Sequence, residues 1–270
     1  FTQSMNEEAT QRLAREAKIK AAHEQDEFIN YYQPIVDSKT GKAVGVELLL
    51  RWQHEGKIIG PNEFINIAEE MGLIIPITER AFERSLRDIK QWISYRPDFY
   101  LSINISALHF LKPGLRTYLE GLLQRYQIPA QHLKLEITET TLIKEPERAI
   151  EKMRSLKALG VSLSLDDFGT GYSSLMYLKR LPLDVIKIDR AFISGIGSDS
   201  NDQAIVDATL VLAQSLGMQC IAEGVESEEQ LNYLAQHDCY CIQGFIYSKP
   251  VPENQITQYL VDDKVEIKVH

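Results

Sequence analysis

Eight short strand-like segments recur along the chain, and helical segments separate most of them. The predicted strands are 31–36, 43–52, 99–105, 133–138, 161–167, 185–189, 219–223 and 239–243. The predicted helices are 61–70, 78–95, 111–126, 146–159, 173–179, 204–216 and 228–236. This alternation, in a chain of 270 residues, predicts an α/β fold of the TIM-type (β/α)8 barrel class and not a doubly wound open sheet.

The first two predicted strands are joined by a short turn over residues 37–42. A parallel pair of strands would need a longer crossover, so this connection suits a hairpin. We therefore expect the first strand to run antiparallel. No linker or low-complexity stretch divides residues 28–270, and a hydrophobic content of 44% is ample for one large core. The sequence predicts a single barrel domain over this range.

The first 27 residues differ in character from the rest of the chain. Residues 5–27 are polar and free of Gly and Pro, which predicts a helix whose weak apolar stripe consists of Leu13, Ala17 and Ala21. Such a helix is either a solvated arm or a linker to an upstream domain, and both readings stay open. Residues 1–4 precede Met5 and are either an expression remnant or the end of a longer segment. We treat residues 1–27 as an N-terminal linker helix.

Composition excludes several classes of function. A net charge of −9 argues against a broad surface for duplex DNA, RNA or anionic membrane, although it allows a small anionic ligand held through metal ions. The six histidines form no HxxxH or HxH pair, which disfavours a histidine-based zinc site. The three cysteines, which form no CxxC pair, are expected to be reduced, buried thiols and not metal ligands: Cys220, Cys239 and Cys241.

Targeting signals are also missing from the sequence pattern. No apolar run reaches the length of a membrane span, and no signal peptide pattern opens the sequence. We therefore expect a cytoplasmic location.

Residues 161–175 join a strand, two adjacent carboxylates and a glycine-rich turn. Apolar residues alternate with small polar ones up to Asp166, and Asp167 then enters a turn with Gly169 and Gly171. A helix is expected over residues 172–180. Two neighbouring anions repel each other, so a hard metal ion is one explanation of the pair. A helix N-cap is the alternative.

Polar residues recur on the alternating faces of the other strands, close to the strand ends, where a closed barrel would gather them at one mouth. Lys187 and Arg51 are the cations of this set. Its oxygen donors suit magnesium or manganese, since no histidine or thiolate accompanies them: Glu47, Asn104, Glu136, Asp166, Asp167 and Glu223. Five carboxylates exceed the needs of one ion. Two ions bridged by Asp166 could activate a water for attack on a phosphodiester.

These residues stand in motifs that resemble those of the EAL-domain family. The resemblance extends from residue 28 to about residue 252 and is carried by Tyr32-Gln-Pro, Glu47-Leu-Leu-Leu-Arg, Asn104-Ile-Ser, Glu136-Ile-Thr-Glu, Asp166-Asp-Phe-Gly-Thr-Gly, Lys187-Ile-Asp, Glu223-Gly-Val-Glu and Gln243-Gly. It implies a bacterial phosphodiesterase that opens cyclic di-GMP to linear pGpG. It also implies two Mg²⁺ or Mn²⁺ ions as cofactors and inhibition by Ca²⁺.

The resemblance implies metal ligands residue by residue. One ion would be held by Glu47, Asn104, Glu136 and Asp166. The other would be held by Asp166, Asp167 and Glu223. Glu47 and Glu223 are thereby counted with the catalytic residues.

Other roles follow from the same resemblance. Lys187 matches a catalytic lysine that orients or deprotonates the attacking water, and its alternative role is that of a counter-ion inside the barrel. Arg51 matches a contact to the substrate phosphate. Glu139 matches the anchor of the loop over residues 168–173, which couples dimerisation to metal binding. Asp189 matches a position of less defined role. Further polar ligand contacts correspond to Gln33, Glu226 and Gln243.

One position departs from the family motif, because Leu48 stands where the family has Ala. Strand parity turns Leu48 away from Glu47 toward the outer helices, where a larger side chain can be accommodated. No matched metal or lysine position is missing, which favours an active hydrolase.

Two alternatives stay open. One is a catalytically silent cyclic di-GMP receptor that relays occupancy through the N-terminal helix. The other is a barrel enzyme for a different phosphate ester. The resemblance also implies a homodimer and an upstream sensory or signalling domain, in a full-length protein that could be tethered to the inner membrane.

Overall fold

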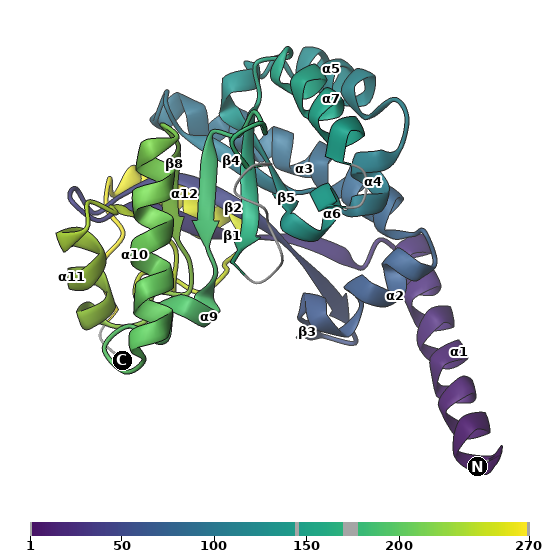
Figure 1. Ribbon diagram of the computed structural model, residues 1–270. Helices are drawn as coiled ribbons and strands as arrows, with labels where there is room; N and C mark the ends of the chain where they lie inside the picture. The colour runs from purple at the N-terminus through teal and green to yellow at the C-terminus, as the bar shows by residue number, and fades with distance from the viewer. Residues whose placement is uncertain (1, 144–145, 170–177, 269–270) are drawn as a thin grey trace.

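The computed structural model describes residues 2–143, 146–169 and 178–268. Its centre is a closed barrel of eight strands, surrounded by helices (Figure 1). The eight strands are β1 (Phe28–Asp37), β2 (Lys42–His54), β4 (Tyr100–Asn104), β5 (Leu133–Thr138), β6 (Ser162–Phe168), β7 (Val185–Ile188), β8 (Gln219–Ala222) and β9 (Cys241–Ile242). The TIM-type barrel predicted from the sequence is confirmed.

Strand β1 is the antiparallel member of this barrel. It pairs antiparallel with β2 on one side and with β9 on the other, and these pairings close the sheet. The remaining neighbours, from β2 through β4 to β9, are parallel. The turn between β1 and β2 is too short for a crossover, so the predicted antiparallel first strand is confirmed.

Helices surround the barrel, and one helix also precedes the first strand and another follows the last. The described helices are α1 (Thr2–Glu24), α2 (Ile65–Glu70), α3 (Ile74–Tyr95), α4 (Ala107–Leu111), α5 (Leu115–Tyr126), α6 (Glu139–Ile143), α7 (Pro146–Lys157), α9 (Arg190–Ile193), α10 (Ser200–Ser215), α11 (Glu228–Gln236) and α12 (Glu253–Val261), with 3-10 turns η1 (Pro61–Glu63) and η2 (Ala130–His132). None of the helices in the described part of the chain is long and apolar enough to cross a bilayer.

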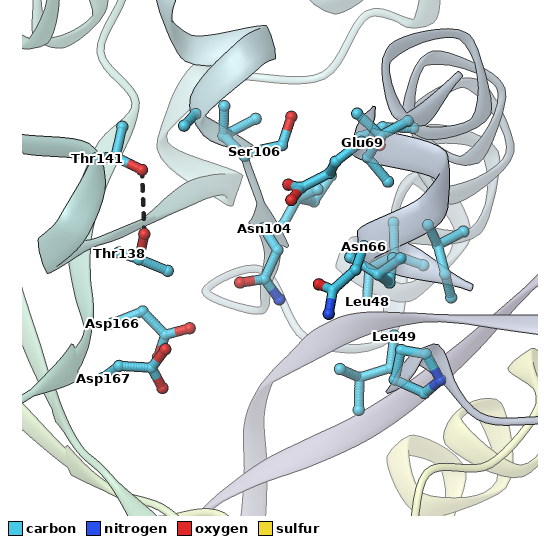
Figure 2. A pocket seen from close by; sticks show the side chains of 18 of the residues that line it. Leu48, Leu49, Asn66, Glu69, Asn104, Ser106, Thr138, Thr141, Asp166 and Asp167 are labelled. Atoms are coloured by element: carbon cyan, nitrogen blue, oxygen red, sulfur yellow. Dashed lines mark hydrogen bonds between the residues drawn. The ribbon is translucent and has the colours of Figure 1, made fainter. Parts of the chain in front are cut away.

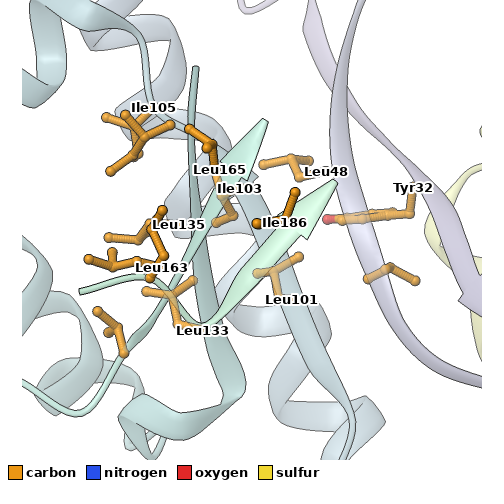
Figure 3. Close-up of a cluster of buried hydrophobic side chains, with 14 of the residues drawn as sticks. Tyr32, Leu48, Leu101, Ile103, Ile105, Leu133, Leu135, Leu163, Leu165 and Ile186 are labelled. Carbon is orange, nitrogen blue, oxygen red and sulfur yellow. The ribbon is translucent and has the colours of Figure 1, made fainter. Parts of the chain in front are cut away.

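The main hydrophobic core lies between the outer face of the barrel and these helices. Strand β5 shows the arrangement, since Leu133, Leu135 and Ile137 point outward while the residues between them point into the barrel. Figure 3 shows Leu133 and Leu135 beside Leu163 and Leu165 of β6. Leu48 belongs to the same core and is 4% exposed. The outer layer therefore accommodates the residue that departs from the family motif.

A second, smaller core lies at one end of β2, and we call it the satellite core. It joins α1 to α2 and to the start of α3, and its buried members are Ile19, Ala22, Phe28, Trp52, Phe64, Ala68, Ile74 and Ile77. The aromatic rings are in contact, with centroids 5.0 Å apart for Phe28 and Phe64 and 6.0 Å apart for Phe28 and Trp52. Helix α1 thus buries one face near its C-terminal end, which the weak apolar stripe did not predict.

Some predicted elements differ from the observed ones. The predicted helix 61–70 is broken into η1 and α2 at Phe64, whose backbone is not helical. The predicted helix 111–126 is observed as α5 from Leu115 onward, and Leu111 instead ends the separate helix α4. A short strand, β3 (Lys57–Ile59), pairs with the end of β2 as a hairpin outside the barrel. The helix expected over 172–180 lies mostly outside the described residues.

Candidate active site

One side chain from each of several neighbouring strands reaches into the barrel near its carboxyl-terminal edge. Glu47 comes from β2, Glu136 from β5, Asp166 from β6 and Lys187 from β7, and Glu223 directly follows β8. We call these five residues the polar cluster. Parallel neighbours place equivalent positions side by side, as the pairing of Asn104 on β4 with Glu136 shows. Residues spread over most of the chain thereby meet in one place.

Lys187 is the centre of the polar cluster. Its side chain is 1% exposed, and its Nζ lies 2.7 Å from Glu136 Oε2, 3.3 Å from Asp166 Oδ1 and 3.4 Å from Glu47 Oε2. It also forms an ion pair with Glu223. A buried ammonium persists as a cation when opposite charges surround it. The structure therefore places Lys187 as the counter-ion of four carboxylates.

Neutral side chains hold Glu47 from the other side. Asn104 Nδ2 donates to Glu47 Oε1 at 2.6 Å, and Gln243 Nε2 donates to Glu47 Oε2. Gln243 Nε2 also lies 3.0 Å from Gln33 Oε1, and Gln33 Nε2 donates to Ser248 O at 3.0 Å. Predicted residues Gln33, Asn104 and Gln243 therefore form one buried network with the polar cluster, although they come from strands far apart in sequence.

The cluster carries more negative charge than Lys187 neutralises. Burial, together with the nearby Glu47 carboxylate, raises the pKa of Glu136 to about 8. Burial likewise raises the pKa of Glu223 well above its usual value. Burial opposes the charge of Lys187, but the carboxylates of Asp166, Glu136 and Glu223 outweigh it and raise the pKa of the amine. A further cation in the cluster would relieve this excess of negative charge.

Asp167 lies beside the cluster in a different backbone conformation. Its φ of 55° falls in the left-handed region, and the pairing of β6 with β7 shifts register between Leu165 and Phe168. Burial, with the neighbouring Asp166 carboxylate, raises the pKa of Asp167 to about 6. The strand was predicted to end at Asp167, whereas it continues to Phe168 with this irregularity inside it.

A cavity of about 830 Å³ opens next to these carboxylates. Asn104, Asp166 and Asp167 reach it from the barrel, and Asn66 and Glu69 face it from α2 (Figure 2). We call residues 61–70, which form η1 and α2, the pocket wall. The cavity thus lies between the barrel mouth and a short segment outside the barrel.

The chemistry of the donor set fits hard divalent ions. The candidate ligands are carboxylates and one amide. Asp166 Oδ1 is buried and accepts no hydrogen bond from the described residues, and the ammonium of Lys187 lies 3.3 Å from it. Within the described ranges, no three His, Cys, Asp or Glu side chains are arranged as a preformed metal site. The carboxylates are instead gathered around the ammonium of Lys187.

Several predicted residues lie apart from this network. Arg51 Nη1 donates to Leu50 O, and its guanidinium carbon lies 5.7 Å from the centre of the Tyr31 ring. Glu226 is exposed and pairs with Arg190 at 2.9 Å. Asp189 caps α9 by accepting a hydrogen bond from Ala191 N at 2.8 Å. No described hydrogen bond or ion pair joins these three residues to the polar cluster, but the charge of Glu47 acts on Arg51, and Asp189 interacts with Asp167.

Glu139 is deeply buried at the start of α6, with 2% of its surface exposed. Neither of its carboxylate oxygens accepts a hydrogen bond within the described part of the chain. The loop that it was predicted to anchor, 168–173, lies mostly outside the described residues. Its anchoring role stays a prediction.

Sequence reasoning missed Ser102, Asn66 and Glu69. Ser102 Oγ donates to Glu136 Oε1 inside the barrel. Strand parity placed Ser102 on the face of Asn104, which was a usable signal. Asn66 and Glu69 lie three positions apart in α2 and face the cavity, but an isolated polar pair on a predicted helix carries no functional signal without knowledge of its neighbours.

Comparisons with protein families, with curated proteins and with solved structures point to the same family. Residues 16–250 match the EAL domain family. Among curated proteins, the chain is 39% identical over 258 residues to the bifunctional diguanylate cyclase/cyclic di-GMP phosphodiesterase MucR of Pseudomonas aeruginosa, covering 95% of this chain and 38% of MucR. It is 35% identical to the cyclic di-GMP phosphodiesterase NbdA of the same organism, covering 96% of this chain and 34% of NbdA. The chain therefore spans less than half the length of either relative.

A solved structure described as the MucR phosphodiesterase in complex with cyclic di-GMP superposes with a TM-score of 0.86. Its sequence is 39% identical, and the match covers 91% of this chain and 99% of that one. The family match covers most of the sequence, and the TM-score shows that the two chains share their fold. This chain belongs to the EAL-domain family, whose phosphodiesterases are typically metal-dependent.

Proposed function

We propose that this chain hydrolyses cyclic di-GMP to linear pGpG with the help of two Mg²⁺ or Mn²⁺ ions. The observation that carries the proposal is the gathering of four carboxylates around buried Lys187, at the edge of a cavity. At about 830 Å³, the cavity falls in the usual size range of small-molecule sites. MucR, the relative solved with cyclic di-GMP, supports the choice of ligand.

The donor set divides into two groups around Asp166. We assign Glu47, Asn104, Glu136 and Asp166 to one ion, and Asp166, Asp167 and Glu223 to the other. Bound divalent ions would neutralise the excess negative charge and supply an activated water. Asn104 and Gln243 hold the Glu47 carboxylate in place by hydrogen bonds, which fixes a ligand before any ion binds. Family resemblance assigns inhibition to Ca²⁺.

Lys187 serves in this proposal as a charged donor. The surrounding carboxylates raise the pKa of its amine, which supports a protonated lysine that orients the attacking water; deprotonation of that water is the other role that the family resemblance implies. Gln33, Gln243, Arg51 and Glu226 are the proposed substrate contacts. Gln33 and Gln243 are already linked to the cluster, whereas Arg51 and Glu226 would have to reach the ligand from their present partners.

The assembly around the barrel is also a proposal. Since MucR and NbdA are more than twice as long as this chain, we infer that the barrel, residues 28–270, works with a further upstream domain joined through residues 1–27. We also infer that the chain forms a homodimer. A monomer mass measured by light scattering at working concentration would contradict this inference.

A chromatographic assay with cyclic di-GMP and Mg²⁺ or Mn²⁺ tests the function. Wild type should form pGpG, Glu47→Ala should not, and Glu228→Gln on the exposed start of α11 should behave as wild type. Binding without turnover in wild type would replace the enzyme by a receptor module that relays occupancy through α1. Turnover of a different phosphate ester alone, in a substrate panel, would reassign the substrate.

A further inference from the structure

Helix α1 is anchored to the body of the protein by its C-terminal half. Ile19 and Ala22 are each 1% exposed in the satellite core, where Phe64 and Ala68 of the pocket wall are fully buried. The N-terminal part of α1 projects away from the barrel (Figure 1), and Leu13 is 66% exposed. Among the residues of α1 whose burial is described, those in its C-terminal half supply its buried apolar contacts.

Polar contacts also hold α1, and the residues that follow it, against the body of the protein. Glu27 Oε2 accepts a hydrogen bond from Trp52 Nε1 at 2.8 Å and lies 2.9 Å from His54 Nδ1. Arg80 of α3 donates to the carbonyl of His23 at 2.7 Å. Farther along the helix, Arg12 pairs with Glu70 of the pocket wall at 2.7 Å. These directional bonds set where α1 lies against β2, α2 and α3.

The pocket wall is a thin layer between α1 and the cavity. Three apolar residues, Leu50, Ile65 and Ile74, pack in or against the satellite core and also line the cavity. On the cavity side, Asn66 and Glu69 face the carboxylates of Asp166 and Asp167 across the opening (Figure 2). A displacement of the satellite core would therefore move groups that face a bound ligand.

The pocket wall depends on the satellite core for its position. Its buried residues, Phe64 and Ala68, belong to that core and not to the main core between barrel and helices. Helix α2 itself spans the six residues Ile65–Glu70, which is too short to be stable without tertiary packing. Loss of the α1 contacts would leave the wall with apolar support from Phe28 of β1 and from β2 and α3.

We propose that α1 is a positioning element of the substrate pocket: its docking through Ile19 and Ala22 holds the pocket wall in the geometry that binds ligand. In the described part of the chain no residue of the polar cluster belongs to this core, so undocking α1 weakens ligand binding and spares the chemical step. By reciprocity of linkage, a ligand in the cavity stabilises the docked helix to the same extent. The inference rests on the proposed function only for the identity of the ligand.

The test compares Ile19→Asp with Leu13→Asp, which places the same charge on the exposed part of the same helix. Binding of cyclic di-GMP, KM and kcat are measured together with amide hydrogen exchange of residues 61–70. Ile19→Asp should raise Kd and KM at least about fivefold, leave kcat unchanged and accelerate exchange in the pocket wall. Leu13→Asp should leave Kd, KM, kcat and the exchange rates unchanged. Ile19→Leu, which keeps an apolar side chain at this position, should keep wild-type affinity.

Three results would overturn the inference: unchanged exchange in the pocket wall of Ile19→Asp, faster exchange with unchanged affinity, or a fall in kcat at constant KM. A wild-type protein that neither binds nor cleaves cyclic di-GMP would refute the proposed function instead. The exchange comparison between the two aspartate variants would then still decide whether α1 holds the wall.

Discussion

Replacing Lys187 by Met removes the cation from the polar cluster and keeps an apolar stem of similar length. Four carboxylates then face one another in a site where the lysine side chain was 1% exposed. Removal of one partner from a buried ion pair typically costs about 3–5 kcal/mol. For a chain of this size, that corresponds to a fall in Tm of about 10 °C. We expect this loss in Lys187→Met at neutral pH in the presence of a chelator.

The loss should depend on protons and on divalent ions. Acid neutralises the orphaned carboxylates, so the variant should approach the stability of wild type as pH falls from neutral toward the ordinary pKa of Glu. Mg²⁺ or Mn²⁺ at a hundredfold excess over the variant's Kd should stabilise the variant by about 2.7 kcal/mol for each bound ion. At the same metal concentration wild type should gain less, because in the variant the ion replaces the missing charge. Urea unfolding followed by circular dichroism, in chelator and in metal, measures both effects.

Lys134 provides a matched control, because it is a second buried lysine pointing into the barrel. Its Nζ donates to Gln219 Oε1 at 3.1 Å and lies 3.6 Å from the centre of the Tyr100 ring, and burial lowers its pKa to about 8. No carboxylate of the described chain forms an ion pair with it. Lys134→Met should stay within about 1 kcal/mol of wild type. Equal losses in both variants, or a Lys187→Met loss insensitive to pH, would refute the electrostatic reasoning.

Three further predictions concern stability alone. Burial lowers the pKa of His109 to about 4, below the unfolded value of about 6.5. The contribution of His109 to the free energy of unfolding is therefore fully present above pH 6.5 and declines by up to about 3 kcal/mol as pH falls to 4. In urea unfolding over this range, the stability of His109→Gln should depend less on pH than that of wild type. Gly121→Ala in the middle of α5 should stabilise by about 0.5–1 kcal/mol in thermal unfolding, since a Cβ there meets no described atom within 4 Å. Gly244→Ala should cost about 3 kcal/mol in the same experiment, since its Cβ would lie 2.0 Å from Val225 O; a neutral result at Gly244 would contradict the close backbone approach.

The sequence was most informative where periodicity and burial coincide. Strand β5 was predicted with its observed bounds, because Leu133, Leu135 and Ile137 alternate with polar residues. Strand β3 was missed because three residues are too few to show a period. The break between η1 and α2 at Phe64 was also missed, since the buried ring serves tertiary packing in the satellite core.

The candidate site could be predicted in part for the same reason. Parity and strand ends correctly gathered Glu47, Glu136, Asp166, Lys187 and Glu223, because parallel strands of a closed barrel bring equivalent positions together. The positions of the pocket wall and of α1 could not be predicted this way. They depend on contacts between segments that share no sheet and show no common period.

The two hydrophobic cores have a practical consequence for how the molecule can be observed. The chain holds two tryptophans, and each core contains one, since Trp52 lies in the satellite core and Trp92 is fully buried in the main core. Intrinsic fluorescence therefore reports separately on the two cores when one indole is replaced by Phe. Coincident denaturation curves from Trp52 and Trp92 would define one cooperative unit, and an earlier Trp52 transition would show that the satellite core unfolds independently of the main core.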